Sequence, residues 1–185
     1  MARYRKENAP NEEISPQRFS ELLKLSGWMK AEYLAYAVLM YWIGCRRSEP
    51  LSLKKQDLTL KNEQLWIKGL PAKKQGKRAE TIKLSIDLVG MEIFEFHIGT
   101  LKKNDNVFSF SDRTGYNIIK QVFGKYPHWL RYNRVTKIRR LIDRGDISKD
   151  EAKAFTGIRS DRTFANYGMV TQEGADKVAG LLKNQ

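Results

Sequence analysis

The segment YLAYAVLMYWIG, residues 33–44, limits most strongly how this chain can fold. In a helix its apolar side chains would face nearly every side, so the helix expected over about 29–43 has to be buried. The segment is too short to cross a membrane, which takes about 20 apolar residues. Gly44 is expected to end the helix. The chain therefore has to build a domain around one buried helix.

Other segments supply helices before the buried one, and strands and helices after it. Ser15 and Pro16 predict a helix start, with an N-cap followed by proline at the first helical position, and this helix is expected to run to Gly27. A short helix is expected through SEPLSL, and alternating β-prone residues predict strands at LTL, LWIK and ETIKLSI (80–86). Further helices are expected at about 87–101, 112–124, 128–144, 148–155 and 171–183. The fold class predicted is α+β: a mainly helical domain with a small three-stranded antiparallel sheet.

The chain is strongly basic. It has 34 Lys and Arg against 21 Asp and Glu, a formal net charge of +13 and a sequence pI near 9.8. The basic residues concentrate in residues 68–83, which include the loop GLPAKKQGKRA, and in residues 125–144. This pattern predicts a polyanionic partner, with double-stranded DNA favoured over acidic lipid. The residues expected to contact DNA are Lys77, Arg78, Arg134, Lys137 and Arg139.

Several kinds of site are excluded by what the sequence lacks. Cys45 is the only cysteine and there are two histidines, which excludes a disulfide framework and a thiolate metal cluster. Gly69 and Gly76 stand too far apart for a phosphate-binding loop, and no serine-hydrolase elbow is present. The N-terminus has no apolar segment of the kind found in secretory signals. We expect no metal, cofactor, small-molecule substrate or membrane partner, and a reduced, cytoplasmic location.

Four segments carry residues suited to metal-free phosphoryl transfer. Residues 41–58, YWIGCRRSEPLSLKKQDL, contain G-x-R-x-x-E; the basic loop between two expected strands holds Lys73 and Lys74; HWLR gives H-x-x-R; and TGIRSDRTFANYG contains Tyr167. His128 and Arg131 would share one helical face. Fixed arginines can stabilise the charge that develops on a phosphate, and a tyrosine hydroxyl can act as nucleophile.

Taken in this order, the segments resemble the tyrosine recombinase (phage integrase) family in its catalytic domain. The resemblance covers about residues 15–183. The family's first box is matched by Gly44, Arg46, Ser48, Glu49 and Leu53; its second by His128, Leu130 and Arg131, with Tyr132 replacing the last histidine; and its third by Gly157, with Tyr167 nine residues beyond position 158.

The resemblance implies a DNA recombinase of a mobile element, which cleaves and rejoins strands through a covalent 3′-phosphotyrosine. Arg46 and Arg131 would hold the scissile phosphate, Tyr167 would be the nucleophile, and His128 would assist proton transfer. Lys74 would be the general acid, with the adjacent Lys73 as the alternative. Glu49 would brace the active-site arginines.

One residue departs clearly from the family pattern. Ile158 stands where the family usually has histidine, and it cannot donate a hydrogen bond; Arg159 or Arg162 could take its place. Without such a donor the rate would fall by about 10²–10³. This departure keeps open a catalytically silent DNA-binding protein on the same fold. A type IB topoisomerase is a further alternative.

The ends of the chain lead to separate expectations. Residues 1–14 are expected to be a polar, basic leader and residues 15–185 the catalytic domain, with the family's N-terminal DNA-clamping domain absent. The helix expected at 171–183 is predicted to mediate self-association on DNA. The protein would then be associated with the nucleoid when bound.

Overall fold

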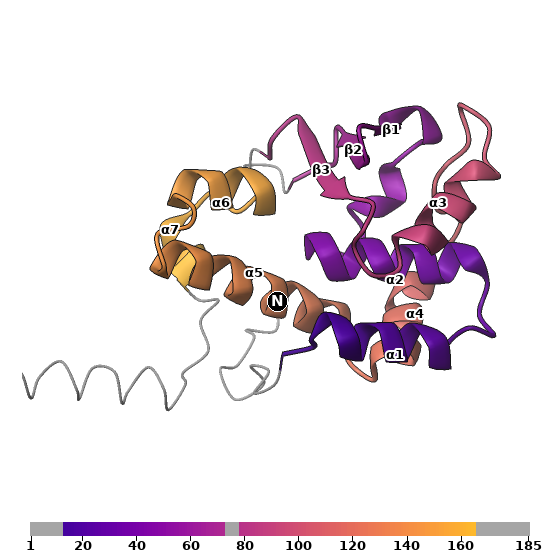
Figure 1. Cartoon of the computed structure of the whole chain (residues 1–185), viewed down its shortest axis with the longest axis horizontal. Coiled ribbons are helices and arrows are strands. Elements are labelled where there is room, and N and C mark those ends of the chain that lie inside the picture. Colours follow the sequence, from indigo (N-terminus) through magenta and orange to yellow (C-terminus); the bar gives the residue numbers. More distant parts are fainter. Residues whose placement is uncertain (1–12, 73–77, 166–185) are drawn as a thin grey trace, which may run out of the picture.

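A computed structural model describes residues 13–72 and 78–165 (Figure 1). Among the predicted site residues, Lys73, Lys74, Lys77 and Tyr167 lie outside the described residues, as does the helix expected at 171–183. Arg46, Glu49, Arg78, His128 and Arg131 all lie within them.

The described chain is mainly helical with one small sheet, which confirms the predicted fold class. The elements, in order, are α1 (Pro16–Leu25), α2 (Ala31–Ile43), two 3₁₀ turns (Pro50–Ser52 and Lys55–Asp57), β1 (Leu58–Lys61), β2 (Gln64–Lys68), β3 (Thr81–Ser85), α3 (Met91–Gly99), α4 (Asp112–Phe123), α5 (Pro127–Asp143), α6 (Lys149–Thr156) and α7 (Asp161–Ala165).

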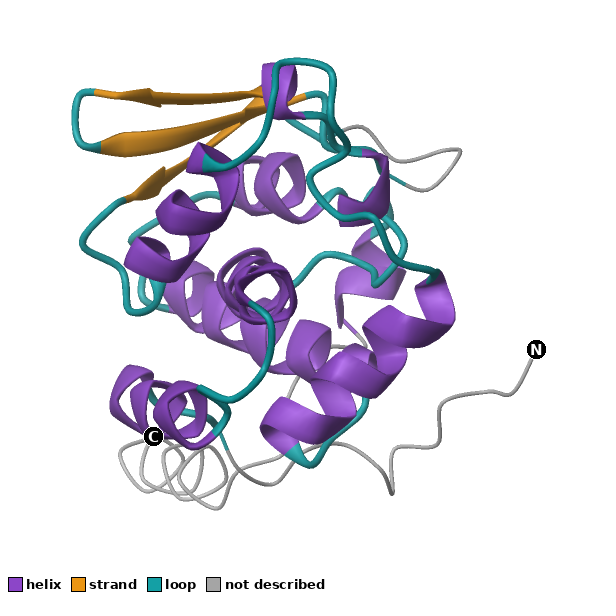
Figure 2. Ribbon diagram, turned by 90° about the vertical axis from the view of Figure 1, so that its right-hand side faces the viewer, coloured by secondary structure: helices purple, strands orange, loops and turns teal. Residues whose placement is uncertain are grey.

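Helix α2 lies at the centre of the domain, as its all-round apolar sequence requires. Its residues from Leu34 to Tyr41 are all buried, and it packs against α3, α4 and α5 (Figure 2). Helix α1 begins as predicted, because the Ser15 side chain accepts a hydrogen bond from the Arg18 backbone N–H. Gly44 ends α2 in the left-handed conformation, with φ of 63°. The buried helix and its predicted end are thus confirmed.

The three strands form an antiparallel sheet in the order β1-β2-β3. Leu65 pairs with Leu84 and Ile67 with Ile82, and all four side chains are buried beneath the sheet. Alternate residues face outward, where the Lys83 ammonium lies 3.9 Å from the centre of the Trp66 ring. The sheet therefore follows the predicted alternation and buries one face against the helices (Figure 2).

A second, smaller apolar cluster forms where α5, α6 and α7 meet (Figure 1). The members are Tyr132, Val135, Ile138, Ala152, Ile158 and Phe164. Helix α7 was not predicted, because its five residues are too few to show helical periodicity.

The helix predicted at about 87–101 begins later, at Met91. Gly90 precedes it with φ of +85°, and a Cβ atom there would lie 2.7 Å from Leu23 Cδ1 and from Val38 Cγ2. This close approach to α1 and α2 requires glycine and starts the helix there. In the part of the chain that the structure describes, no helix is both long and apolar enough to span a membrane.

Candidate active site

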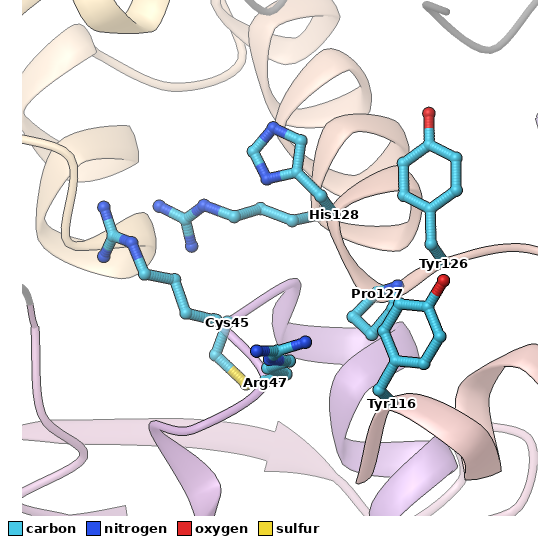
Figure 3. A pocket seen from close by; sticks show the side chains of 8 residues that line it. Cys45, Arg47, Tyr116, Tyr126, Pro127 and His128 are labelled. Atoms are coloured by element: carbon cyan, nitrogen blue, oxygen red, sulfur yellow. The ribbon is translucent and has the colours of Figure 1, made fainter. Parts of the chain in front are cut away.

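A pocket of about 250 Å³ lies where the turn after α2 meets α4 and the start of α5 (Figure 3). His128 reaches it from the first turn of α5, and Tyr116 reaches it from α4 (Figure 3). The lining residues are Cys45, Arg46, Arg47, Tyr116, Tyr126, Pro127, His128 and Arg131. The structure therefore brings together Arg46, His128 and Arg131, three residues that the sequence placed in one site.

Arg46 is held in the turn that follows α2. Its Nη1 donates to Glu49 Oε1 at 2.7 Å, and its backbone N–H donates to Glu49 Oε2 at 2.8 Å. The Arg46 side chain remains 34% exposed, whereas that of Glu49 is 7% exposed. Glu49 thus braces Arg46 from the buried side and leaves the guanidinium beside the pocket.

Arg131 lies on α5 and is 1% exposed, one of the largest buried side chains among the described residues. Its Nη1 donates to the Gly44 carbonyl at 2.8 Å, and its Nη2 donates to the Thr156 carbonyl at 3.3 Å. These bonds connect α5 to the ends of α2 and α6. Because the acceptors are carbonyls and not carboxylates, the positive charge of Arg131 is not cancelled by them.

His128 lies one helical turn before Arg131, and more than a third of its surface is exposed. Partial desolvation lowers the pKa of His128, and the positive charges of Arg131 and Arg46 lower it further. The neutral imidazole is therefore favoured near pH 7, where one ring nitrogen donates a hydrogen bond and the other accepts one.

Five lining residues were not predicted as site residues, and three of them, Arg47, Tyr116 and Tyr126, carry a guanidinium or hydroxyl group. Arg47 pairs with Asp112 at 2.7 Å, and its guanidinium lies 5.8 Å from the centre of the Tyr116 ring. Tyr126 precedes α5 directly. Arg47 and Tyr126 could have been predicted, because they lie within two residues of Arg46 and His128 in the sequence. Tyr116 lies near no predicted site residue in the sequence, so no such signal existed for it.

The structure does not support the predicted DNA contact of Arg78, because its side chain is 1% exposed and, unlike Arg131, does not line the pocket. Its donors point into the protein, at acceptors that include Glu49 and the end of α6. A basic loop in sequence does not show which of its cations turns inward.

Arg134 and Lys137, also predicted to bind DNA, make contacts within the domain. Arg134 donates to the Tyr41 carbonyl from Nε at 3.1 Å and from Nη2 at 2.9 Å, which satisfies an acceptor near the end of α2. Lys137 Nζ donates to the Ile14 carbonyl at 3.1 Å. Arg139 is partly exposed on the same helix and stays a prediction.

Ile158 does not line the pocket. Its side chain is 2% exposed and belongs to the second apolar cluster with Tyr132 and Phe164. Arg159, the next residue, is exposed. Within residues 13–72 and 78–165, no group of three His, Cys, Asp or Glu side chains is placed to hold a metal ion.

Comparison with known proteins gives matches among solved structures alone. No family model matches the chain, and no curated protein matches it. The XerH site-specific recombinase, in a post-cleavage complex with a palindromic difH substrate, is similar with a TM-score of 0.70 and 16% identity over 94% of this chain and 55% of that one. The XerA recombinase gives a TM-score of 0.63 and 14% identity over 94% of this chain and 66% of that one.

The Tn1549 transposon integrase, in complex with circular intermediate DNA, gives a TM-score of 0.57 and 16% identity over 95% of this chain and 67% of that one. The chain thus spans between about half and two thirds of the length of these structures. At such low identity the likeness concerns the fold. The chain has the catalytic-domain fold found in these site-specific recombinases and integrases.

Proposed function

We propose that this chain is the catalytic domain of a tyrosine-type, site-specific DNA recombinase that serves as the integrase of a mobile element. The observation that carries the proposal is the convergence of Arg46, His128 and Arg131 on one pocket from two separate elements. The shared fold of the XerH and Tn1549 proteins, whose structures contain DNA, supports it.

In the proposed reaction, Arg46 and Arg131 bind the non-bridging oxygens of one phosphodiester. Both guanidinium groups present planar forks of donors, which suit a phosphate better than lysine does. Because their partners fix them before substrate arrives, little reorganisation is needed when charge develops in the transition state. Neutral His128 lies beside them and can donate to the same phosphate or relay a proton.

The covalent step balances without metal or water. The Tyr167 oxygen forms a bond to phosphorus while the bond from phosphorus to the 5′-oxygen breaks. The leaving 5′-oxygen takes a proton from Lys74, or from Lys73, and the proton of the tyrosine hydroxyl passes to neutral His128. The phosphotyrosine keeps the energy of the original bond, so a free 5′-hydroxyl can attack it and rejoin a strand.

The partner is double-stranded DNA, bound mostly through its phosphates. With a net charge of +13, binding should weaken steeply as salt rises. Lys77 and Arg139 remain proposed DNA contacts. The helix expected at 171–183 mediates self-association on DNA. The bound protein is then nucleoid-associated.

The test is capture of a covalent adduct on a pool of random-sequence duplexes that carry single nicks. A short nicked strand diffuses away after cleavage, so the adduct cannot be reversed. After denaturation and nuclease digestion, mass spectrometry should find a nucleotide remnant on Tyr167, and sequencing of the captured DNA gives the site. Tyr167→Phe should abolish the adduct and leave DNA binding nearly unchanged. A remnant on another tyrosine would disprove the assigned nucleophile.

A catalytically silent DNA-binding protein is the second candidate. The burial of Ile158 away from the pocket favours it, because the family's histidine donor has no equivalent at that position. Salt-sensitive binding of the duplex pool with no adduct on any sequence would support this second candidate.

A further inference from the structure

Arg78 stands at the end of a basic loop, yet its side chain is buried and contacts three separate segments. Nε donates to the Phe155 carbonyl at 3.1 Å, and Nη1 donates to the Pro71 carbonyl at 2.8 Å. Nη2 donates to the Thr156 carbonyl at 3.0 Å and to Glu49 Oε2 at 3.2 Å. One guanidinium therefore ties the segment before β3 to the end of α6 and to the turn after α2.

Two of these acceptors are shared with the arginines of the pocket. Glu49 also accepts from Arg46, through its other oxygen at 2.7 Å and from the backbone N–H. The Thr156 carbonyl also accepts from Arg131 Nη2 at 3.3 Å. Arg78 is therefore joined to Arg46 and to Arg131, in each case through a single shared acceptor.

The end of α6 is built around this contact. The last carbonyl groups of a helix accept no hydrogen bond from within the helix. In α6 they accept hydrogen bonds from residues 78–79 instead, and the Ala79 backbone N–H donates to the Ala154 carbonyl at 2.8 Å. Gly157 ends α6 with φ of +67°, and a Cβ atom there would lie 3.3 Å from Arg78 Nε. Because Gly157 has no side chain, the Arg78 guanidinium can lie close to the backbone at the end of α6.

We propose that Arg78 is a positioning residue, which sets the placement of Arg46 and Arg131 relative to one another by holding the acceptors that they share with it. Lysine cannot replace it, because a point-like ammonium lacks the planar fork that reaches these acceptors at once. The contacts of Arg78 suffice to support this positioning of Arg46 and Arg131. The effect of Arg78 on DNA cleavage rests, in addition, on the proposed function.

The first experiment reads the arrangement without DNA. Arginine side-chain ¹⁵N–¹H spectra of the full chain are compared between the natural protein and Arg78→Lys. The Nε–H signals of Arg46 and Arg131 should shift or broaden, while that of Arg18, exposed and paired with Glu21, should not move. Unchanged Arg46 and Arg131 signals would overturn the proposal, whatever the protein does to DNA.

The second experiment measures adduct formation on a nicked duplex identified by the capture assay. At saturating DNA, Arg78→Lys should slow adduct formation by about 10- to 100-fold, as expected for a small misplacement of catalytic groups. Affinity for the duplex should change less than about threefold, because binding to phosphates elsewhere is kept. Ile98→Ala, a buried change on α3, serves as the control for lost stability. Its adduct rate should equal that of the natural protein below the unfolding temperature.

A double variant covers the case in which loss of Arg78 prevents folding. Arg78→Met together with Glu49→Gln removes both charges of the buried pair, so no unpaired charge is left inside. It should fold, yet form adduct at least about tenfold more slowly than Glu49→Gln alone. Equal rates for these two variants would mean that Arg78 only neutralises Glu49, and would overturn the proposal. If the natural protein forms no adduct, the proposed function fails and the spectra alone decide this inference.

Discussion

Glu49 accepts two hydrogen bonds from Arg46, one from the backbone N–H at 2.8 Å and one from Nη1 at 2.7 Å. The carboxylate thus fixes both the start of the turn and the end of the side chain that leads into the pocket. Since Glu49 is nearly buried while Arg46 is partly exposed, the pair presents an oriented cation to the pocket with its counter-charge behind it. This arrangement suits binding of an anion that arrives from the open side.

Removing that carboxylate should cost much stability. Glu49→Ala leaves the buried Arg78 guanidinium without its anionic partner, and we expect a loss of roughly 3–5 kcal/mol in the free energy of unfolding. Urea unfolding with an unchanged m-value measures it. Glu21→Ala is the matched control, since its ion pair with Arg18 is about half exposed and should contribute less than about 1 kcal/mol. Similar losses for the two variants would contradict the role given to the buried pair.

Two glycines that end helices in the same conformation should differ in their tolerance of alanine. Gly124 has φ of +64° and no atom within 4 Å of an added Cβ, so Gly124→Ala should cost roughly 1–2 kcal/mol from backbone strain alone. Gly44 has φ of +63°, but its added Cβ would lie 2.5 Å from Arg134 Cβ. Gly44→Ala should therefore cost about 1–3 kcal/mol more. Thermal or urea unfolding of Gly44→Ala and Gly124→Ala measures the two losses of stability. Equal losses would contradict the prediction and show that α5 moves away from the added Cβ without strain.

Gly44 also shows why parts of the site could be predicted from sequence. A glycine after an apolar helix signals a helix end by a local rule, and the boxes around Arg46 and His128 have fixed spacings. Arg78 shows the limit. Whether a cation in a basic loop faces DNA or turns inward depends on acceptors more than 70 residues away in sequence, at the end of α6, and no local pattern encodes that contact.

The stability of the domain should depend on the charge of His128. Desolvation and the charges of Arg131 and Arg46 lower its pKa in the folded protein below the ordinary value near 6.5. On acidification the unfolded chain therefore binds the proton first. This contribution to stability is full above about pH 6.5 and is lost as the pH falls through the folded pKa.

The measurement compares the free energy of unfolding between pH 7.5 and pH 5 for the natural protein and His128→Gln. The natural protein should lose more on acidification, and the difference reports on position 128 because the two proteins are otherwise identical. Adding sulfate, an anion that the pocket should accept, should raise the His128 pKa in an NMR titration. A steeper loss in His128→Gln would mean that the folded pKa is raised and not lowered.

Introducing histidine at position 158, where the tyrosine recombinases that the sequence resembles usually carry one, should not improve catalysis. The Ile158 side chain lies in the apolar cluster with Tyr132 and Phe164 and away from the pocket. An imidazole at this position would therefore bury its polar nitrogens among apolar side chains. We expect Ile158→His to lower the free energy of unfolding by roughly 2–4 kcal/mol. Ile158→Val, which keeps the cluster apolar, should cost about 0.5–1.5 kcal/mol.

Urea unfolding compares the stability of the two variants, and adduct formation on the captured duplex compares their rates. Both rates should stay at or below that of the natural protein, because neither side chain reaches the phosphate. If Ile158→His forms adduct faster than the natural protein, the apolar cluster must rearrange so that position 158 turns toward Arg131. Isoleucine at this position would then limit the rate of an otherwise complete site.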